Sequence, residues 1–160
     1  MLMAEARSRG STHNSRWIKA TPEALYRAFT DPVALATWMA PGDMTGEVHS
    51  FDHRVGGGYR MSLYYPLTDT SARGKTSERE DSYTSRFVEL EPPRRIVEAI
   101  TFASADPAFT GEMIMEITLE AENGGTMVTM TFKDIPVGIR PEDNEVGTES
   151  SLAKLAQYVE

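Results

Sequence analysis

The chain has 160 residues, of which 40% are hydrophobic and 9% aromatic, and its formal net charge at pH 7 is −8. This length favours one domain that buries about 68–70% of its unfolded surface without covalent cross-links. The sequence contains no cysteine, which excludes disulfides, thiolate metal sites and a cysteine nucleophile. The acidic balance argues against nucleic acid as a partner, because phosphates require clustered lysine and arginine.

No apolar run approaches the roughly 20 residues that a membrane-spanning helix needs. The first residues, MLMAEARSRGSTHNSR, lack the apolar segment of a signal peptide. We therefore expect a cytoplasmic protein without membrane insertion. Residues 1–14 are expected to form a flexible N-terminal tail and residues 15–160 a single domain.

The first predicted elements are a strand at Ser15–Ala20 and two short helices in tandem. Each helix has its own start signal, because Thr21 and Asp31 are good N-cap residues and each is followed by a proline. Leucine, tryptophan and other apolar side chains recur at helical spacing in both segments, which indicates that each helix buries one face.

From Met44 onward the hydrophobic period changes to two, which is typical of strands. Turn signals rich in glycine, proline and asparagine separate the candidate strands, which are Met44–His53, Tyr59–Tyr65, Tyr83–Leu90, Ile96–Ala103, Thr110–Glu122 and Thr126–Asp134. Because no helices intervene, this pattern predicts an antiparallel meander. Residues 66–78 are polar, and we interpret them as a solvated connection rather than a functional lid.

The last segment, Pro141–Val159, is the only predicted long helix. Its C-terminal half carries an apolar stripe that includes Leu152, Leu155 and Ala156, whereas the same face upstream carries Thr148 and two glutamates. The apolar half can seal a core, and the polar half could border a cavity or open water. The predicted class is therefore α+β: a seven-stranded antiparallel sheet, two short helices after the first strand, and a long C-terminal helix packed on the sheet.

Few residues suggest catalysis or metal binding. His49 and His53 lie on one predicted strand roughly 13 Å apart, too far to chelate one metal, and we interpret them as edge or surface residues. Gly56–Gly58 lacks the Lys-Ser/Thr ending of a phosphate loop and leads into a strand, which favours a hairpin turn with a bulge. We expect neither a metal nor a cofactor.

Five stretches carry a resemblance to a known family, in the same order along the chain: IKATPEALYRAFTDPVALATWMAP, DHRVGGGYR, ELEPPRRIVEAITF, GGTMVTMTF and SLAKLAQYV. From Ser15 to the end, the chain resembles the SRPBCC superfamily of START-like, or helix-grip, proteins. Within that superfamily it is similar to bacterial homologues of the activator of the 90-kilodalton heat-shock protein ATPase.

The resemblance implies a helix-grip fold with a deep, mostly apolar cavity between the sheet and the C-terminal helix. Across the superfamily such cavities take lipids, hormones and polyketides, and some members are enzymes such as cyclases. Trp38, Pro41, Asp52 and Arg54 match family positions that look structural. Gly147 is followed here by Thr148, where relatives often carry tryptophan, and losing that ring would enlarge or wet the cavity mouth.

Our preferred hypothesis is the binding of a small, mostly apolar ligand without catalysis. The residues predicted to line the cavity are Trp38, Met44, Tyr59, Met61, Phe87, Met115, Thr148 and Leu152. Two alternatives stay open: a chaperone-interacting module, and a cyclase- or hydrolase-like enzyme that would use a cavity group among His49, His53, Tyr59 and Glu149. The family resemblance also leaves a homodimer open.

Overall fold

The structure is a computed structural model that describes residues 9–67 and 79–160. The first eight residues of the predicted tail, and most of the predicted 66–78 loop, lie outside the described residues. The first strand, β1, spans Gly10–Ile18. It begins upstream of the strand predicted from the sequence, so residues 10–14 belong to the sheet and not to a tail.

The two tandem helices are present and both are capped as predicted. Helix α2 spans Pro22–Phe29, and the Thr21 side chain accepts a hydrogen bond from the backbone N–H of Ala24 at 3.1 Å. Helix α3 spans Pro32–Trp38, and Asp31 accepts hydrogen bonds from two backbone N–H groups of its first turn. These bonds satisfy N–H groups that a helix start otherwise leaves unpaired.

A single seven-stranded sheet follows, in the order β1-β7-β6-β5-β4-β3-β2, and each neighbouring pair is antiparallel. The remaining strands are β2 (Thr45–Asp52), β3 (Gly58–Tyr64), β4 (Glu80–Glu91), β5 (Arg95–Phe102), β6 (Met113–Glu122) and β7 (Gly125–Ile135). The predicted meander and α+β class are therefore confirmed. Strand β6 starts at Met113 and not at Thr110 as predicted, and before it Pro107–Phe109 forms a short 3-10 helix, η1, capped by Asp106.

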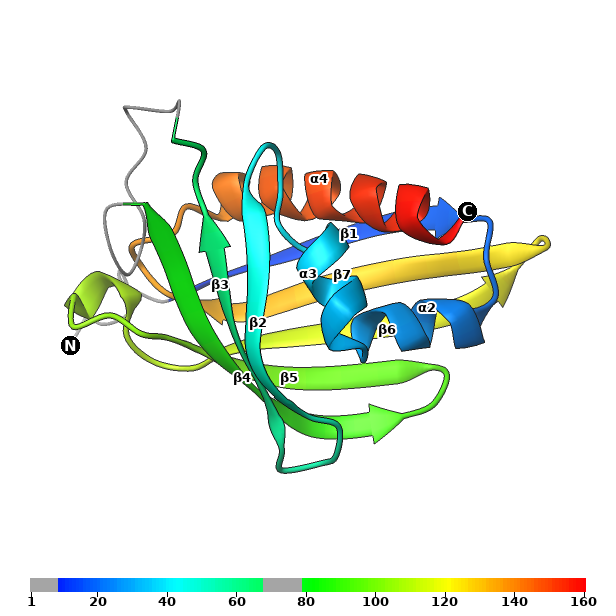
Figure 1. The fold of residues 1–160 in the computed structure, drawn as a ribbon, viewed down its shortest axis with the longest axis horizontal. Helices are drawn as coiled ribbons and strands as arrows, with labels where there is room; N and C mark the ends of the chain where they lie inside the picture. The colour runs from blue at the N-terminus through cyan, green and yellow to red at the C-terminus, as the bar shows by residue number, and fades with distance from the viewer. Residues whose placement is uncertain (1–8, 68–78) are drawn as a thin grey trace.

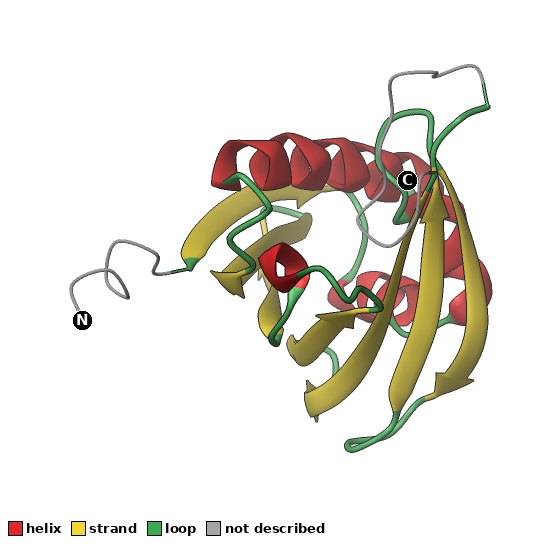
Figure 2. Ribbon diagram, turned by 90° about the vertical axis from the view of Figure 1, so that its left-hand side faces the viewer, coloured by secondary structure: helices red, strands yellow, loops and turns green. Residues whose placement is uncertain are grey.

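Helix α4 spans Pro141–Val159 and lies along the sheet beside β1 and β7 (Figure 1). Figure 2 shows the strands curving beneath this helix, so that the helix and the concave face of the sheet enclose the interior of the domain. Leu152, Leu155 and Ala156 of α4 are buried in that interior. The predicted apolar half of the helix thus packs on the core, as amphipathicity requires.

Helices α2 and α3 fill one end of the space beneath α4. The buried Trp38 ring packs edge-on against Phe29, with ring centroids 4.8 Å apart, and its Nε1–H donates to the backbone carbonyl of Ala28 at 2.9 Å. Both helices also contact α4. The opposite end, beneath the N-terminal half of α4, is covered by no such helix pair in the described part of the chain.

Strand β2 departs from the alternation that the sequence suggested. Its register against β3 shifts between Val48 and Ser50, which is a β-bulge at His49. Because of the extra residue, Val48 and Phe51 both pack against the core, although a regular strand would place them on opposite faces. His49 is exposed, and its Nε2 lies 2.9 Å from the Ser62 hydroxyl.

Candidate functional site

A cavity of about 490 Å³ lies beneath the N-terminal half of α4. It forms where β3, β5 and β7 approach their ends, where β4 and β6 begin, and where η1 and the segment before α4 close the side. Its lining consists of Met39, Pro41, Met44, Leu63, Tyr65, Asp81, Tyr83, Ile100, Phe102, Phe109, Met113, Met115, Met130, Phe132, Gly138, Ile139, Asp143, Asn144, Gly147, Thr148 and Ser151.

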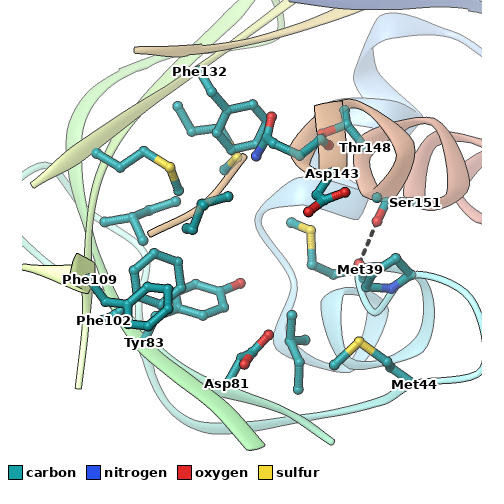
Figure 3. A pocket seen from close by; sticks show the side chains of 18 of the residues that line it. Met39, Met44, Asp81, Tyr83, Phe102, Phe109, Phe132, Asp143, Thr148 and Ser151 are labelled. Atoms are coloured by element: carbon teal, nitrogen blue, oxygen red, sulfur yellow. Dashed lines mark hydrogen bonds between the residues drawn. The ribbon is translucent and has the colours of Figure 1, made fainter. Parts of the chain in front are cut away.

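The wall on the sheet side is mostly apolar. It consists of aromatic rings, methionines and isoleucines, because alternate residues of each strand point to the concave face. In the strand register, Met115 of β6 lies opposite Phe132 of β7. Tyr83 of β4 likewise lies opposite Phe102 of β5. Figure 3 shows Phe102, Phe109 and Tyr83 together on one side of the cavity. Such a wall favours apolar ligands, since the water it contacts is released on binding.

The wall on the helix side is polar. Figure 3 shows Asp143, Thr148 and Ser151 on the opposite side from the aromatic group. The Thr148 hydroxyl donates to the backbone carbonyl of Asn144 at 2.8 Å, and the Ser151 hydroxyl donates to that of Met39 at 2.7 Å. The Ser151 bond ties α4 to the residue that follows α3, so this wall is held in place by hydrogen bonds between residues that line the cavity.

Three of the eight residues predicted to line the cavity are among its lining residues: Met44, Met115 and Thr148. Met44 lies just before β2, and Met115 lies on the concave face of β6. Thr148 is buried in the N-terminal half of α4, where the inward face of the helix has no apolar stripe.

The other five residues lie outside the lining, in the packed core: Trp38, Tyr59, Met61, Phe87 and Leu152. Tyr59 and Phe87 face inward as predicted, but they lie toward the other end of the sheet, where Phe51 stacks on Tyr59 with ring centroids 5.6 Å apart. Leu152 lies one helical turn beyond Thr148. Alternation along a strand fixes which face a side chain occupies, but not how far along the sheet the packed core extends.

None of the groups named for the enzyme hypothesis is among the lining residues, which include neither His49, His53, Tyr59 nor Glu149. His53 is exposed at the far end of β2, with its ring 6.2 Å from that of Phe87. The phenols that do reach the cavity belong to Tyr65 and Tyr83.

A buried carboxylate next to the cavity escaped the sequence interpretation. Glu98 of β5 is fully buried, and its Oε1 accepts hydrogen bonds from the Tyr59 hydroxyl at 2.8 Å and the Ser85 hydroxyl at 2.6 Å. Burial raises the pKa of Glu98 to about 7, although both hydrogen bonds act to lower it. The signal in the sequence was a lone glutamate inside the apolar run IVEAITF.

The described part of the chain contains neither a cluster of acidic and histidine side chains able to hold a metal ion, nor a helix long and apolar enough to cross a membrane.

A curved antiparallel sheet that grips a long C-terminal helix, with a cavity between them, defines the START-like helix-grip class. Residues 19–160 match the family model described as "Activator of Hsp90 ATPase homolog 1-like protein", and the chain belongs to this family. A search of curated proteins found no match.

Solved structures share the fold over nearly the whole chain. A protein from Chromobacterium violaceum is 33% identical, with a TM-score of 0.81 over 93% of this chain and 96% of that one. A Rhodobacter sphaeroides protein is 22% identical, with a TM-score of 0.72 and coverages of 94% and 91%. An AHSA1-like protein from Aeromonas hydrophila is 23% identical, with a TM-score of 0.68 and coverages of 94% and 92%. The last two likenesses concern the fold alone.

Proposed function

We propose that the protein binds a small, mostly apolar molecule in the cavity beneath α4. The observation that carries this proposal is the cavity itself, whose volume of about 490 Å³ is bounded by an apolar sheet wall and a polar helix wall. Ligand sites typically have volumes of about 300–1,000 Å³, with a mostly apolar lining and a few polar groups that orient the ligand.

The binding energy in such a site comes mainly from apolar burial. Each Å² of apolar surface removed from water contributes about 25 cal/mol, against which the costs of association must be set. The rings of Phe102, Phe109 and Phe132 line the cavity and offer aromatic contact area. The polar side chains on α4 then orient the ligand rather than hold it.

A thermal-unfolding screen against a library of apolar compounds tests the proposal. A ligand present at a hundred times its dissociation constant stabilises the folded state by about 2.7 kcal/mol, which raises the unfolding temperature. We expect Phe109→Ala to reduce that increase because it removes part of the cavity wall. Val33→Ala, at an exposed position on α3 away from the lining, is the matched control and should leave it unchanged.

Absence of any stabilising compound across a diverse apolar library would overturn the proposal. A ligand-induced rise in unfolding temperature that Phe109→Ala and Val33→Ala reduce equally would also count against binding in this cavity.

Family membership favours a second candidate, a module that interacts with a chaperone. A pull-down with the 90-kilodalton bacterial chaperone, combined with an assay of its ATPase rate, tests this candidate separately from ligand binding. We expect retention on the chaperone and a changed ATPase rate if it is correct. If the protein is not retained on the chaperone and the ATPase rate does not change, this candidate is ruled out.

A further inference from the structure

The lining of the cavity carries formal charge of one sign only. Its described residues include two aspartates, Asp81 and Asp143, and neither a lysine, an arginine nor a histidine. The two carboxylates come from different elements, because Asp81 lies near the start of β4 and Asp143 in the first turn of α4. Figure 3 shows Asp143 on the helix side and Asp81 on the β4 side of the same space. A ligand in this cavity therefore meets a negative electrostatic potential.

Asp81 is the buried member of this pair. It is 3% exposed, and it lies two residues before Tyr83, so that both side chains occupy the concave face of β4. The Tyr65 hydroxyl donates to Asp81 Oδ2 at 3.3 Å, and Tyr65 also lines the cavity. A carboxylate offers about four acceptor sites, so this bond is compatible with a further bond from a ligand.

Asp143 is the exposed member of the pair, on the helix side. It is the third residue of α4, and its side chain makes neither a hydrogen bond nor an ion pair with any described residue. The next residue, Asn144, also lines the cavity, and its Oδ1 accepts a hydrogen bond from the Thr12 hydroxyl at 2.6 Å. This bond joins α4 to β1, so the Asp143 carboxylate stands on an anchored turn, where it can contact both a ligand and water.

Basic side chains from the neighbouring segments bind outside the cavity. Arg140 pairs with Glu142 at 3.5 Å, Arg79 donates to the Pro66 carbonyl at 2.8 Å, and Lys154 donates to a backbone carbonyl of the segment after α3. These three side chains are not among the lining residues. Within the described lining, the charge of the two aspartates is therefore not balanced by a cation.

We propose that the ligand is an apolar molecule that carries one protonated amine, and that Asp81 and Asp143 select for this group. The inference rests on the proposed ligand-binding function and adds the charge of the ligand. An ammonium group that enters the cavity loses part of its hydration, and a carboxylate replaces this loss with a charge-assisted hydrogen bond. An ionised carboxylic acid of the same size would instead be repelled by the two aspartates.

The rest of the cavity is compatible with a cation. Tyr83, Phe102 and Phe109 lie together on one side, and the face of such a ring attracts an ammonium group. The N-terminus of α4 opposes a cation, because it carries the positive end of the helix dipole, equivalent to about half a charge. Two carboxylates in the first turn of α4, those of Glu142 and Asp143, outweigh this half charge.

The test compares three indole derivatives of similar size that differ in the charge of one end. At pH 7 tryptamine carries an ammonium group, 3-ethylindole is neutral, and indole-3-propionate carries a carboxylate. Their dissociation constants are measured by displacement of the neutral fluorescent reporter N-phenyl-1-naphthylamine. We expect tryptamine to bind most tightly and indole-3-propionate least tightly, with about tenfold or more between them. Raising the ionic strength from about 20 to about 500 mM should reduce this ratio, because salt screens the attraction.

Two substitutions and a matched control locate the effect. Asp143→Asn and Asp81→Asn each remove one charge from the lining, and each should reduce the preference for tryptamine over 3-ethylindole by about threefold or more. Glu149→Gln removes an exposed carboxylate of α4 that lies outside the lining, and the preference should remain. Circular dichroism verifies that each variant is folded. Asp143→Asn and the salt dependence give an independent answer should Asp81→Asn fail to fold.

Equal binding of tryptamine and 3-ethylindole overturns the inference, as does a preference that survives in Asp143→Asn or in folded Asp81→Asn. A preference that falls equally in Glu149→Gln also overturns it, because the net charge of the whole protein is then the source. In each of these outcomes 3-ethylindole still displaces the reporter, so the proposed function stands. If neither the reporter nor any other apolar compound binds, the proposed function falls and this inference falls with it.

Discussion

At the scale of single residues, the interior of this protein combines a packed apolar core with a fully buried carboxylate, that of Glu98. Glu98 shares the concave face with Ile96, Ile100 and the methionines of β6. Its two hydrogen-bond donors stabilise the ionised form, but they do not replace the lost hydration, because one carboxylate oxygen has no partner in the described structure. The carboxylate therefore lowers stability whenever it is charged.

This burial predicts a pH dependence of stability. The folded-state pKa of Glu98 is raised from 4.5 to about 7, so between these values the folded protein binds more protons than the unfolded chain. The contribution of Glu98 to the free energy of unfolding therefore falls as pH rises from about 4.5 to 7. The loss is on the order of 3 kcal/mol. Urea unfolding at a series of pH values measures it.

Glu98→Gln should remove that decline, because an amide stays neutral throughout. Glu120→Gln, at an exposed position on β6, is the matched control and should retain it. Equal slopes for Glu98→Gln and the unsubstituted protein would contradict the prediction.

The residues that line the cavity could be predicted from the sequence only in part. Met115 and Thr148 lie in the cavity lining as predicted, because face alternation along a strand and polarity along a helix are local properties of the chain. Tyr59 and Phe87 have the same local signature, yet they pack in the core because α2, α3 and Phe51 occupy that end of the sheet. Glu98 was missed because nothing in its neighbouring residues reveals that Tyr59, on another strand, donates to it.

At the scale of elements, the helix starts and the order of the strands were the most predictable features. Thr21 and Asp31 cap the two short helices as their sequence context indicated, and α4 has the predicted bounds. The bulge at His49 was not predictable from the period-two pattern, because it depends on pairing with β3. The early start of β1 likewise depends on β7, whose Ile135 pairs with Gly10.

Helix α4 contains a glycine in its interior that offers a test of helix propensity. A Cβ at Gly147 would find only Pro41 side-chain atoms at 3.9 Å, which is ordinary van der Waals contact. Gly147→Ala should therefore increase the free energy of unfolding by about 0.5–1 kcal/mol, since alanine loses less entropy in a helix. Chemical denaturation measures the change.

Gly58→Ala is the contrasting substitution. Its φ is +147°, and an added Cβ would lie 1.9 Å from the Ser85 carbonyl oxygen, so it should destabilise the fold. Destabilisation by Gly147→Ala would show that α4 needs flexibility at this point.

At the scale of the whole molecule, the interior is divided between a filled end and a hollow end. Helices α2 and α3, with the C-terminal half of α4, close the filled end around Trp38 and Leu155. The hollow end lies beneath the N-terminal half of α4 (Figure 3). The polar half of α4 thus borders the cavity because it has no apolar stripe with which to close it.

Filling the cavity from the helix side should weaken ligand binding without unfolding the protein. Thr148 is buried and faces the cavity, so Thr148→Trp should occupy ligand space and remove at least half of any ligand-induced rise in unfolding temperature. Thr148→Val keeps the side-chain size and loses only a hydroxyl that bonds within α4, so it should retain that rise. A full ligand response in Thr148→Trp would place the binding site elsewhere.

The pairing of β1 with β7 has a consequence for how the polypeptide reaches this shape. Ile18 pairs with Thr126 and Gly10 with Ile135. Strand β1 therefore cannot pair with β7 until most of the chain has been synthesised. Contacts this distant in sequence are entropically slow to form. Ile18 is fully buried in the folded protein, so during translation its side chain stays without its β7 neighbours until the last part of the sheet has been synthesised.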